Sequence, residues 1–256
     1  LEDTLQLMNN DEIDETNIPV IVRHLERCSE IFRLLASQWK VMETLSPQDF
    51  LAFRDRLGTS SGFESWQLRT LEMLLGLKSE QRIGGMDPME HNKKLHSEGK
   101  LSDEVMANME RIATLPSLYD VLLRWLERTP VNGVSGDKEV MTEFVESHIA
   151  SMIEHGEKVI SHMVKIGHGD EETIRPRITA GIDAAREFLL PSGEVSFSRA
   201  GLLFIESYRE LPLLSWPRRL IDTVVDLEES MLLFRSHHAR MVERMIGRRM
   251  GTGGSS

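Results

Sequence analysis

His238 stands on a predicted helix at a position where an apolar residue is expected. Between Pro217 and Ile246 there is no internal glycine or proline, and apolar residues recur at helical spacing. His238 follows Phe234 by four residues and precedes Met241 by three, on the centre line of this stripe. An imidazole on a dry helix face could present one ring nitrogen to a metal ion or a haem iron. The alternative is a core histidine that is hydrogen-bonded to a neighbouring carbonyl, and spacing leaves both open.

Arg54 is the second unusual placement. In a helix predicted over residues 47–57, the apolar side carries Phe50, Phe53 and Leu57, and Arg54 lies within the same arc. A guanidinium directed toward an apolar interior needs an anion, because an unpaired buried charge is costly. A carboxylate ligand, held by two parallel hydrogen bonds, is one candidate partner, and an internal salt bridge is the other.

Two further segments have the residue types of caps or anion sites. Residues 61–64 read Ser-Gly-Phe-Glu, which matches a capping box in which Ser61 caps a helix and Glu64 reaches back from its third position. The run 251–256, Gly-Thr-Gly-Gly-Ser-Ser, resembles a backbone nest for an anion, although a flexible linker would have the same composition. It lacks the lysine of a phosphate-binding loop, so nucleotide binding is not expected.

His148, His155 and His162 recur every seven residues on one predicted helix. Residues seven apart on a helix are separated by about 10.5 Å along its axis, so these three side chains cannot share one ion. We interpret them as the flank of a core stripe. The stripe comprises Val145, Ile149, Met152 and Ile160.

The elements that must position these residues are predicted to be helices throughout, because no stretch shows the alternation of a half-buried strand. Helices are expected at residues 18–43, 47–57, 63–75, 103–113, 117–128, 138–165, 171–190, 197–209 and 217–246, with Leu1–Met8 also helical. Residues 77–102 are polar, contain glycines and a proline, and are expected to form a loop. We predict an all-α helical bundle in which 1–131 and 196–256 form the core and 132–195 an inserted helical subdomain.

Composition excludes several classes of function. The formal charge of −11 argues against nucleic acid or an anionic membrane as a partner. The single cysteine, Cys28, rules out an internal disulfide framework and fits the reducing cytosol. No apolar run is long enough to span a membrane, and no signal peptide is visible. We therefore expect a cytoplasmic protein.

Three blocks resemble the tryptophan 2,3-dioxygenase family, a group of histidine-ligated, haem-dependent aromatic oxygenases. The first is residues 43–58, ETLSPQDFLAFRDRLG, and the second is residues 60–69, SSGFESWQLR. The third is residues 238–247, HARMVERMIG, leading into GTGGSS at 251–256. The resemblance implies a helical bundle that encloses a b-type haem, and a cytoplasmic homotetramer of the kynurenine pathway of tryptophan catabolism.

The resemblance also implies roles for individual residues. Toward the haem, His238 would be the proximal ligand of the iron, Ser61 and Gly62 would line the pocket, and Arg69 would pair with a propionate. Toward the substrate, Arg54 would hold the carboxylate, Phe50 would pack against the indole, and Thr252 would meet the ammonium and carboxylate. The expected reaction is dioxygenation of L-tryptophan by O₂ across the indole C2–C3 bond to give N-formylkynurenine.

Some features depart from the family pattern. The family's distal histidine would lie upstream of Leu1, so no catalytic residue is assigned within the chain. Glu64 replaces the usual glutamine, Trp66 and Leu68 replace a more usual leucine and aromatic residue, and Phe234 stands where tryptophan is common. Two alternatives follow: a mono-oxygenase of tryptophan or a modified tryptophan that forms an oxindole-type product, and a non-catalytic haem sensor. An intact Arg54 and glycine-rich loop argue against the sensor, which needs no amino-acid clamp.

Overall fold

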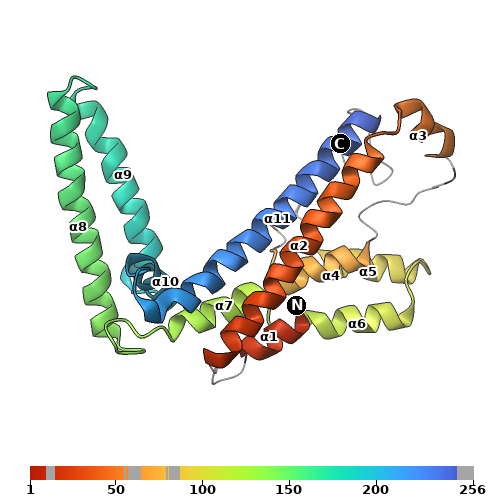
Figure 1. The fold of residues 1–256 in the computed structure, drawn as a ribbon, viewed down its shortest axis with the longest axis horizontal. Coiled ribbons are helices and arrows are strands. Elements are labelled where there is room, and N and C mark those ends of the chain that lie inside the picture. Colours follow the sequence, from red (N-terminus) through yellow and green to blue (C-terminus); the bar gives the residue numbers. More distant parts are fainter. Residues whose placement is uncertain (10–14, 55, 57–64, 79, 81–86, 247–256) are drawn as a thin grey trace. The chain divides into compact units, whose positions relative to one another are not determined.

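The computed structural model describes residues 1–9, 15–54, 56, 65–78, 80 and 87–246, and in these residues the chain is helical without a β-strand (Figure 1). The all-α prediction is confirmed. The chain divides into two compact units. The first comprises residues 1–121 and 216–256, and the second comprises residues 122–215.

Apart from α5, the helices of the first unit match the predicted ones within a few residues. They are α1 (Glu2–Asn9), α2 (Ile18–Met42), α3 (Pro47–Arg54), α4 (Trp66–Leu75), α5 (Pro88–Ser97), α6 (Asp103–Ala113) and α11 (Ser215–Ile246), with a 3₁₀ turn at Glu15–Asn17. Helix α7 (Leu118–Glu127) passes from the first unit into the second. Both α4 and α5 pack on α6.

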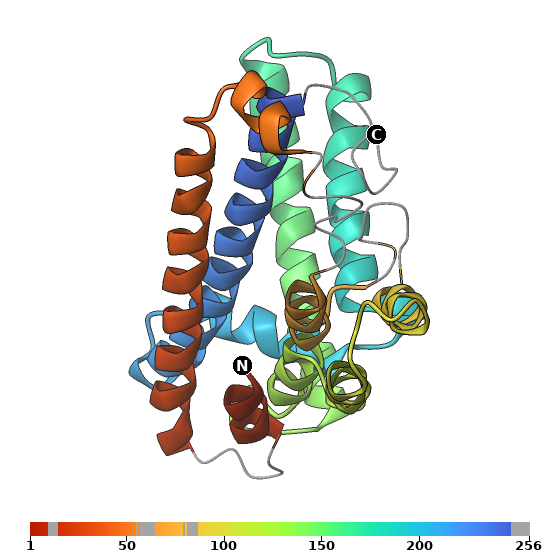
Figure 2. The same cartoon turned by 90° about the vertical axis from the view of Figure 1, so that its right-hand side faces the viewer.

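Helices α2 and α11 lie side by side and run parallel, as Figures 1 and 2 both show. Three ion pairs join them in the same order along both helices: Glu26 with Arg219, Asp226 with Arg33, and Glu43 with Arg244 at 2.8 Å. Exposed ion pairs of this kind contribute about 0–1 kcal/mol each to the free energy of unfolding. Their main effect is to fix the register of α2 against α11. The apolar side chains beneath them, such as Leu220 and Leu227, are buried.

The start of α3 is fixed by a reciprocal cap between Ser46 and Asp49. The Asp49 backbone N–H donates to Ser46 Oγ at 3.1 Å, and the Asp49 carboxylate accepts from the Ser46 backbone N–H at 3.1 Å and from its hydroxyl at 2.6 Å. These hydrogen bonds lower the pKa of Asp49, because they favour its ionised form. The reciprocal cap fixes where α3 begins, and therefore where the side chains of Phe50 and Arg54 emerge.

The cap of α4 differs from the prediction. The helix begins at Trp66, and its N-cap is Ser65, whose hydroxyl accepts from the Leu68 backbone N–H at 3.4 Å. The predicted N-cap, Ser61, lies four residues earlier, and the capping box over residues 61–64 lies outside the described residues. The predicted end is confirmed, because Gly76 is the C-cap with φ of +91°, a conformation that glycine adopts without strain.

The predicted loop over residues 77–102 is wrong for residues 88–97, which form α5. The Asp87 carboxylate accepts from the backbone N–H groups of Met89 and Glu90, and Pro88 occupies the first helical position. This Asp-Pro start signal outweighs the polar composition of the segment.

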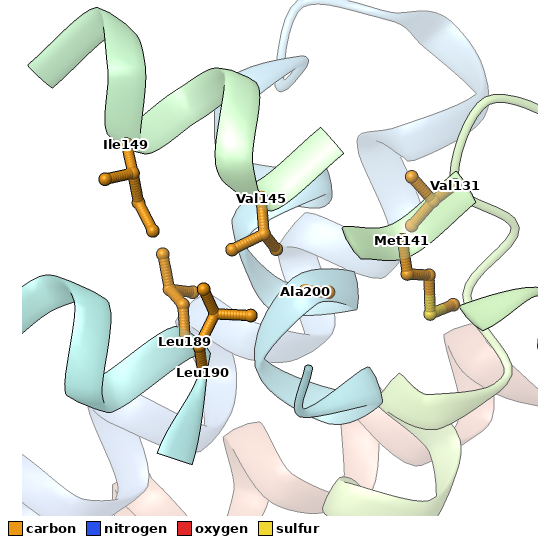
Figure 3. Packing of buried hydrophobic residues seen from close by; sticks show 7 residues of the cluster. All are labelled: Val131, Met141, Val145, Ile149, Leu189, Leu190 and Ala200. Carbon is orange, nitrogen blue, oxygen red and sulfur yellow. The ribbon is translucent and has the colours of Figure 1, made fainter. Parts of the chain in front are cut away.

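The second unit is built on α8 (Lys138–Lys165) and α9 (Glu171–Leu189), which form an antiparallel hairpin. A 3₁₀ turn at Pro191–Gly193, α10 (Phe197–Ser207) and a second turn at Pro212–Leu214 complete it. Figure 3 shows its core, in which α8, α9 and α10 direct apolar side chains toward one another. The core residues are Val131, Met141, Val145, Ile149, Leu189, Leu190 and Ala200. The insertion predicted at 132–195 lies within this unit, and its boundaries stay a prediction.

The histidines of α8 lie as the core-stripe interpretation predicts. Ile149 and Ile160 are buried, whereas His155 and His162 are exposed to solvent. Within the described residues, no group of three or more His, Cys, Asp or Glu side chains could hold a metal ion. In the same part of the chain, no helix is long and apolar enough to cross a membrane.

Candidate functional site

His238 lies on the face of α11 that packs toward α2. Its imidazole is half-buried and stacks on the indole of Trp39, with ring centroids 4.6 Å apart at an interplanar angle of 36°. Burial lowers the pKa of His238, because the charged form is poorly solvated there. The ring is therefore neutral near pH 7, which is the protonation state that a metal ligand requires.

The neighbouring histidine makes the contact that a structural histidine would make. His237 Nδ1 lies 3.3 Å from the carbonyl oxygen of Ala36 on α2. In contrast, neither ring nitrogen of His238 has a hydrogen-bond partner among the described residues. The carbonyl contact that the sequence leaves open for His238 is thus made by His237, and the role of His238 as an iron ligand stays a prediction.

Four rings form what we call the aromatic cluster: Phe32 and Trp39 from α2, and Phe234 and His238 from α11. Phe234 lies 6.1 Å from Phe32 and 5.5 Å from Trp39 between ring centroids. Trp39 is not among the site residues predicted from the sequence. Its signal is the seven-residue spacing from Phe32, which places both rings on one face of α2.

Helix α3 carries the two predicted substrate residues. Phe50 and Phe53 meet edge to face with centroids 5.3 Å apart. Arg54 is half-buried at the last position of the helix, and it forms no ion pair with any residue that the structure describes. The internal salt bridge that could explain Arg54 is therefore not found among the described residues, and its role as a carboxylate clamp stays a prediction.

Arg69 lies on α4 in a different environment. Its side chain is buried, and its Nη1 lies 2.9 Å from a carboxylate oxygen of Glu72, which is also buried. A buried guanidinium needs a counter-charge, and Glu72 already supplies one. The predicted pairing of Arg69 with a haem propionate stays a prediction.

The predicted site residues are only partly brought together. Within the described residues, no hydrogen bond, ion pair or ring contact joins Phe50 or Arg54 to His238. Helix α3 nevertheless lies at the end of the first unit where the last turns of α11 lie (Figures 1 and 2). Ser61, Gly62 and Thr252 lie outside the described residues.

A cavity of about 680 Å³ opens in the first unit among α1, α2, α4 and α6. Its lining is mostly apolar and includes Phe32, so the cavity and the aromatic cluster share a wall. Trp66, one of the departures from the family pattern, also lines it. Sequence spacing did not indicate this cavity, because its walls come from four separate helices.

The lowered pKa of His238 predicts a pH dependence of stability in the haem-free protein. As pH falls below about 6.5, the unfolded chain protonates this residue before the folded chain does. The contribution of the neutral His238 ring to the free energy of unfolding is therefore fully present above that pH, and it is lost as the pH falls. Relative to His238→Gln, which does not titrate, the wild-type protein should lose unfolding free energy between pH 7 and 5. Denaturant titrations at several pH values measure this difference, and parallel profiles would contradict it.

Comparison with known proteins identifies the family to which the chain is similar. The family model of tryptophan 2,3-dioxygenase matches residues 1–256. A tryptophan 2,3-dioxygenase of Sorangium cellulosum is 38% identical over 98% of this chain and 64% of its own length. Tryptophan 2,3-dioxygenase 2 of Ralstonia nicotianae is 37% identical over 98% of this chain and 71% of its own length.

A third relative is named as a dioxygenase-like protein. This tryptophan 2,3-dioxygenase-like protein of Xanthomonas campestris pv. campestris is 40% identical over 83% of both chains. The chain thus spans roughly two thirds of the length of the first two relatives. Together with the all-helical fold, these matches show that the chain belongs to the tryptophan 2,3-dioxygenase family of oxidoreductases.

Proposed function

We propose that the protein holds a b-type haem through His238 and uses O₂ to convert L-tryptophan into N-formylkynurenine. The observation that carries the proposal is the state of His238. It is a half-buried, neutral imidazole with no hydrogen-bond partner among the described residues, within a chain that matches the family over its whole length. The resemblance extends the proposal to a homotetramer.

The residues present fit a haem at this position. A neutral imidazole offers a lone pair to iron, and the neighbouring aromatic rings provide the apolar surface that a porphyrin face needs. Within the described residues there is no competing cluster of metal donors. When bound, the haem iron supplies the binding and activation of O₂, which no side chain can supply.

The protein's own residues bind and orient the amino acid. Arg54, without an ion-pair partner in the described chain, holds the substrate carboxylate through parallel hydrogen bonds, and Phe50 packs against the indole. By the family resemblance, Thr252 would contact the ammonium and carboxylate groups of the substrate. Holding the carboxylate and the indole together orients the indole C2–C3 bond for reaction with O₂.

The test is the mass of the product formed from L-tryptophan and ¹⁸O₂. Insertion of both atoms of ¹⁸O₂ adds about four mass units to the unlabelled product, and it consumes no net electrons. Reduced enzyme, labelled O₂ and L-tryptophan alone should therefore sustain many turnovers. A product with one labelled oxygen, formed only with added reductant or peroxide, would contradict dioxygenation. It would support the mono-oxygenase that the departures at Trp66, Leu68 and Phe234 left open.

A further inference from the structure

The indole of Trp39 lies against both residues that α11 presents at the proposed haem position. It contacts the His238 imidazole and the Phe234 ring in tilted arrangements, with ring centroids 4.6 and 5.5 Å away and interplanar angles of 36° and 38°. Phe234 and His238 are one helical turn apart, so a single indole from α2 covers two successive side chains of α11. Any group that His238 binds lies next to this indole.

The indole nitrogen of Trp39 is a buried donor without an acceptor. Among the described residues, Nε1 makes no hydrogen bond and is shielded from solvent. A buried tryptophan N–H usually has a partner, because an unmade hydrogen bond costs free energy. Tryptophan offers only a donor, so the missing partner must be an acceptor.

No residue that the structure describes accepts a hydrogen bond from this N–H. A group bound at His238 lies next to the indole and is therefore a candidate source of the acceptor. In a haem, the four ring nitrogens hold the iron, so the acceptors at the edge of the molecule are the two propionate carboxylates.

We propose that Trp39 is a haem-binding residue whose indole N–H donates a hydrogen bond to a propionate carboxylate. This inference rests on the proposed function, because it requires haem at His238. The family resemblance places a tryptophan more commonly at the position of Phe234, on α11. In this chain the indole comes from the facing helix, and the two rings contact each other.

The test compares haem with haem dimethyl ester, whose esterified propionates carry no charge. Trp39→Phe keeps an aromatic ring in the cluster and removes the N–H. We expect haem affinity, measured by absorbance titration of the haem-free protein, to fall about ten- to a hundredfold, as for a hydrogen bond to a charged acceptor. Affinity for the dimethyl ester should fall by less than about threefold, because an ester is a weaker acceptor.

Two further variants serve as control and rescue. Trp216→Phe makes the same chemical change on the exposed first turn of α11, about 33 Å along the helix from His238, and should leave both affinities unchanged. The exchange variant Trp39→Phe/Phe234→Trp returns an indole to the same ring contact from the other helix. It should recover most of the lost haem affinity.

The outcomes separate this inference from the proposed function. Equal losses for haem and its dimethyl ester, or no loss for either, would overturn the role of the N–H. If Trp39→Phe alone folds poorly, the exchange variant carries the test: recovery of the preference for haem over the ester supports the inference, and no recovery refutes it. Retention of haem by His238→Ala would instead overturn the proposed function, whatever the result at Trp39.

Discussion

His238→Ala is expected to abolish stoichiometric haem binding while the helix content stays close to that of the wild type. The variant removes the only predicted bond between protein and iron, so the haem absorbance should disappear from the purified protein. Alanine has the highest helix propensity, and His238 is only half-buried, so α11 should remain folded. Absorbance spectra and far-UV circular dichroism measure the two effects on the same sample.

The adjacent histidine provides a matched control. His237→Ala removes an imidazole from the same turn of α11, and with it the contact to the Ala36 carbonyl. It should lower stability by about 0.5–1.5 kcal/mol, the usual contribution of one hydrogen bond, and retain the haem. Added imidazole should restore haem absorbance to His238→Ala by occupying the space that the side chain leaves. If His238→Ala retained the haem and His237→Ala lost it, the iron ligand would be His237 and the proposed assignment would be wrong.

The helices of this fold were predictable because their signals are local. The stripe through His238 follows from apolar spacing within one helix, and α11 includes the whole predicted range 217–246. The start of α3 follows from Ser46 and Asp49, which form their cap within four residues. The error at α5 has the opposite cause: the polar composition of the segment predicts a loop, although Asp87 and Pro88 carry a helix-start signal.

The candidate site was less predictable, because its contacts join residues about 200 positions apart. His237 and His238 are equivalent in type and adjacent in sequence. Only the packing of α11 against α2 assigns the Ala36 carbonyl to one and the Trp39 indole to the other. Arg69 also illustrates this limit, because its partner Glu72 lies one turn away, but burial of the pair depends on the surrounding helices.

Arg54→Ala is expected to weaken binding of L-tryptophan far more than binding of tryptamine. A charged, hydrogen-bonded pair that is buried in a complex is commonly worth about 2–5 kcal/mol on truncation, which corresponds to a factor of about 30 or more. Tryptamine has no carboxylate, so it loses nothing when the guanidinium is removed. Arg56→Ala, at an exposed position two residues along the chain, is the matched control and should change neither affinity.

The comparison of two ligands separates a substrate clamp from a structural role. A guanidinium that supported only the fold would, on removal, weaken L-tryptophan and tryptamine equally, and equal weakening would refute the clamp. Arg54→Lys adds a second criterion, because lysine keeps the charge but cannot form two parallel hydrogen bonds to one carboxylate. It should recover part of the affinity for L-tryptophan that alanine loses. Within the described residues Arg54 has no carboxylate partner of its own, so we expect the difference between the two ligands to come from the substrate carboxylate.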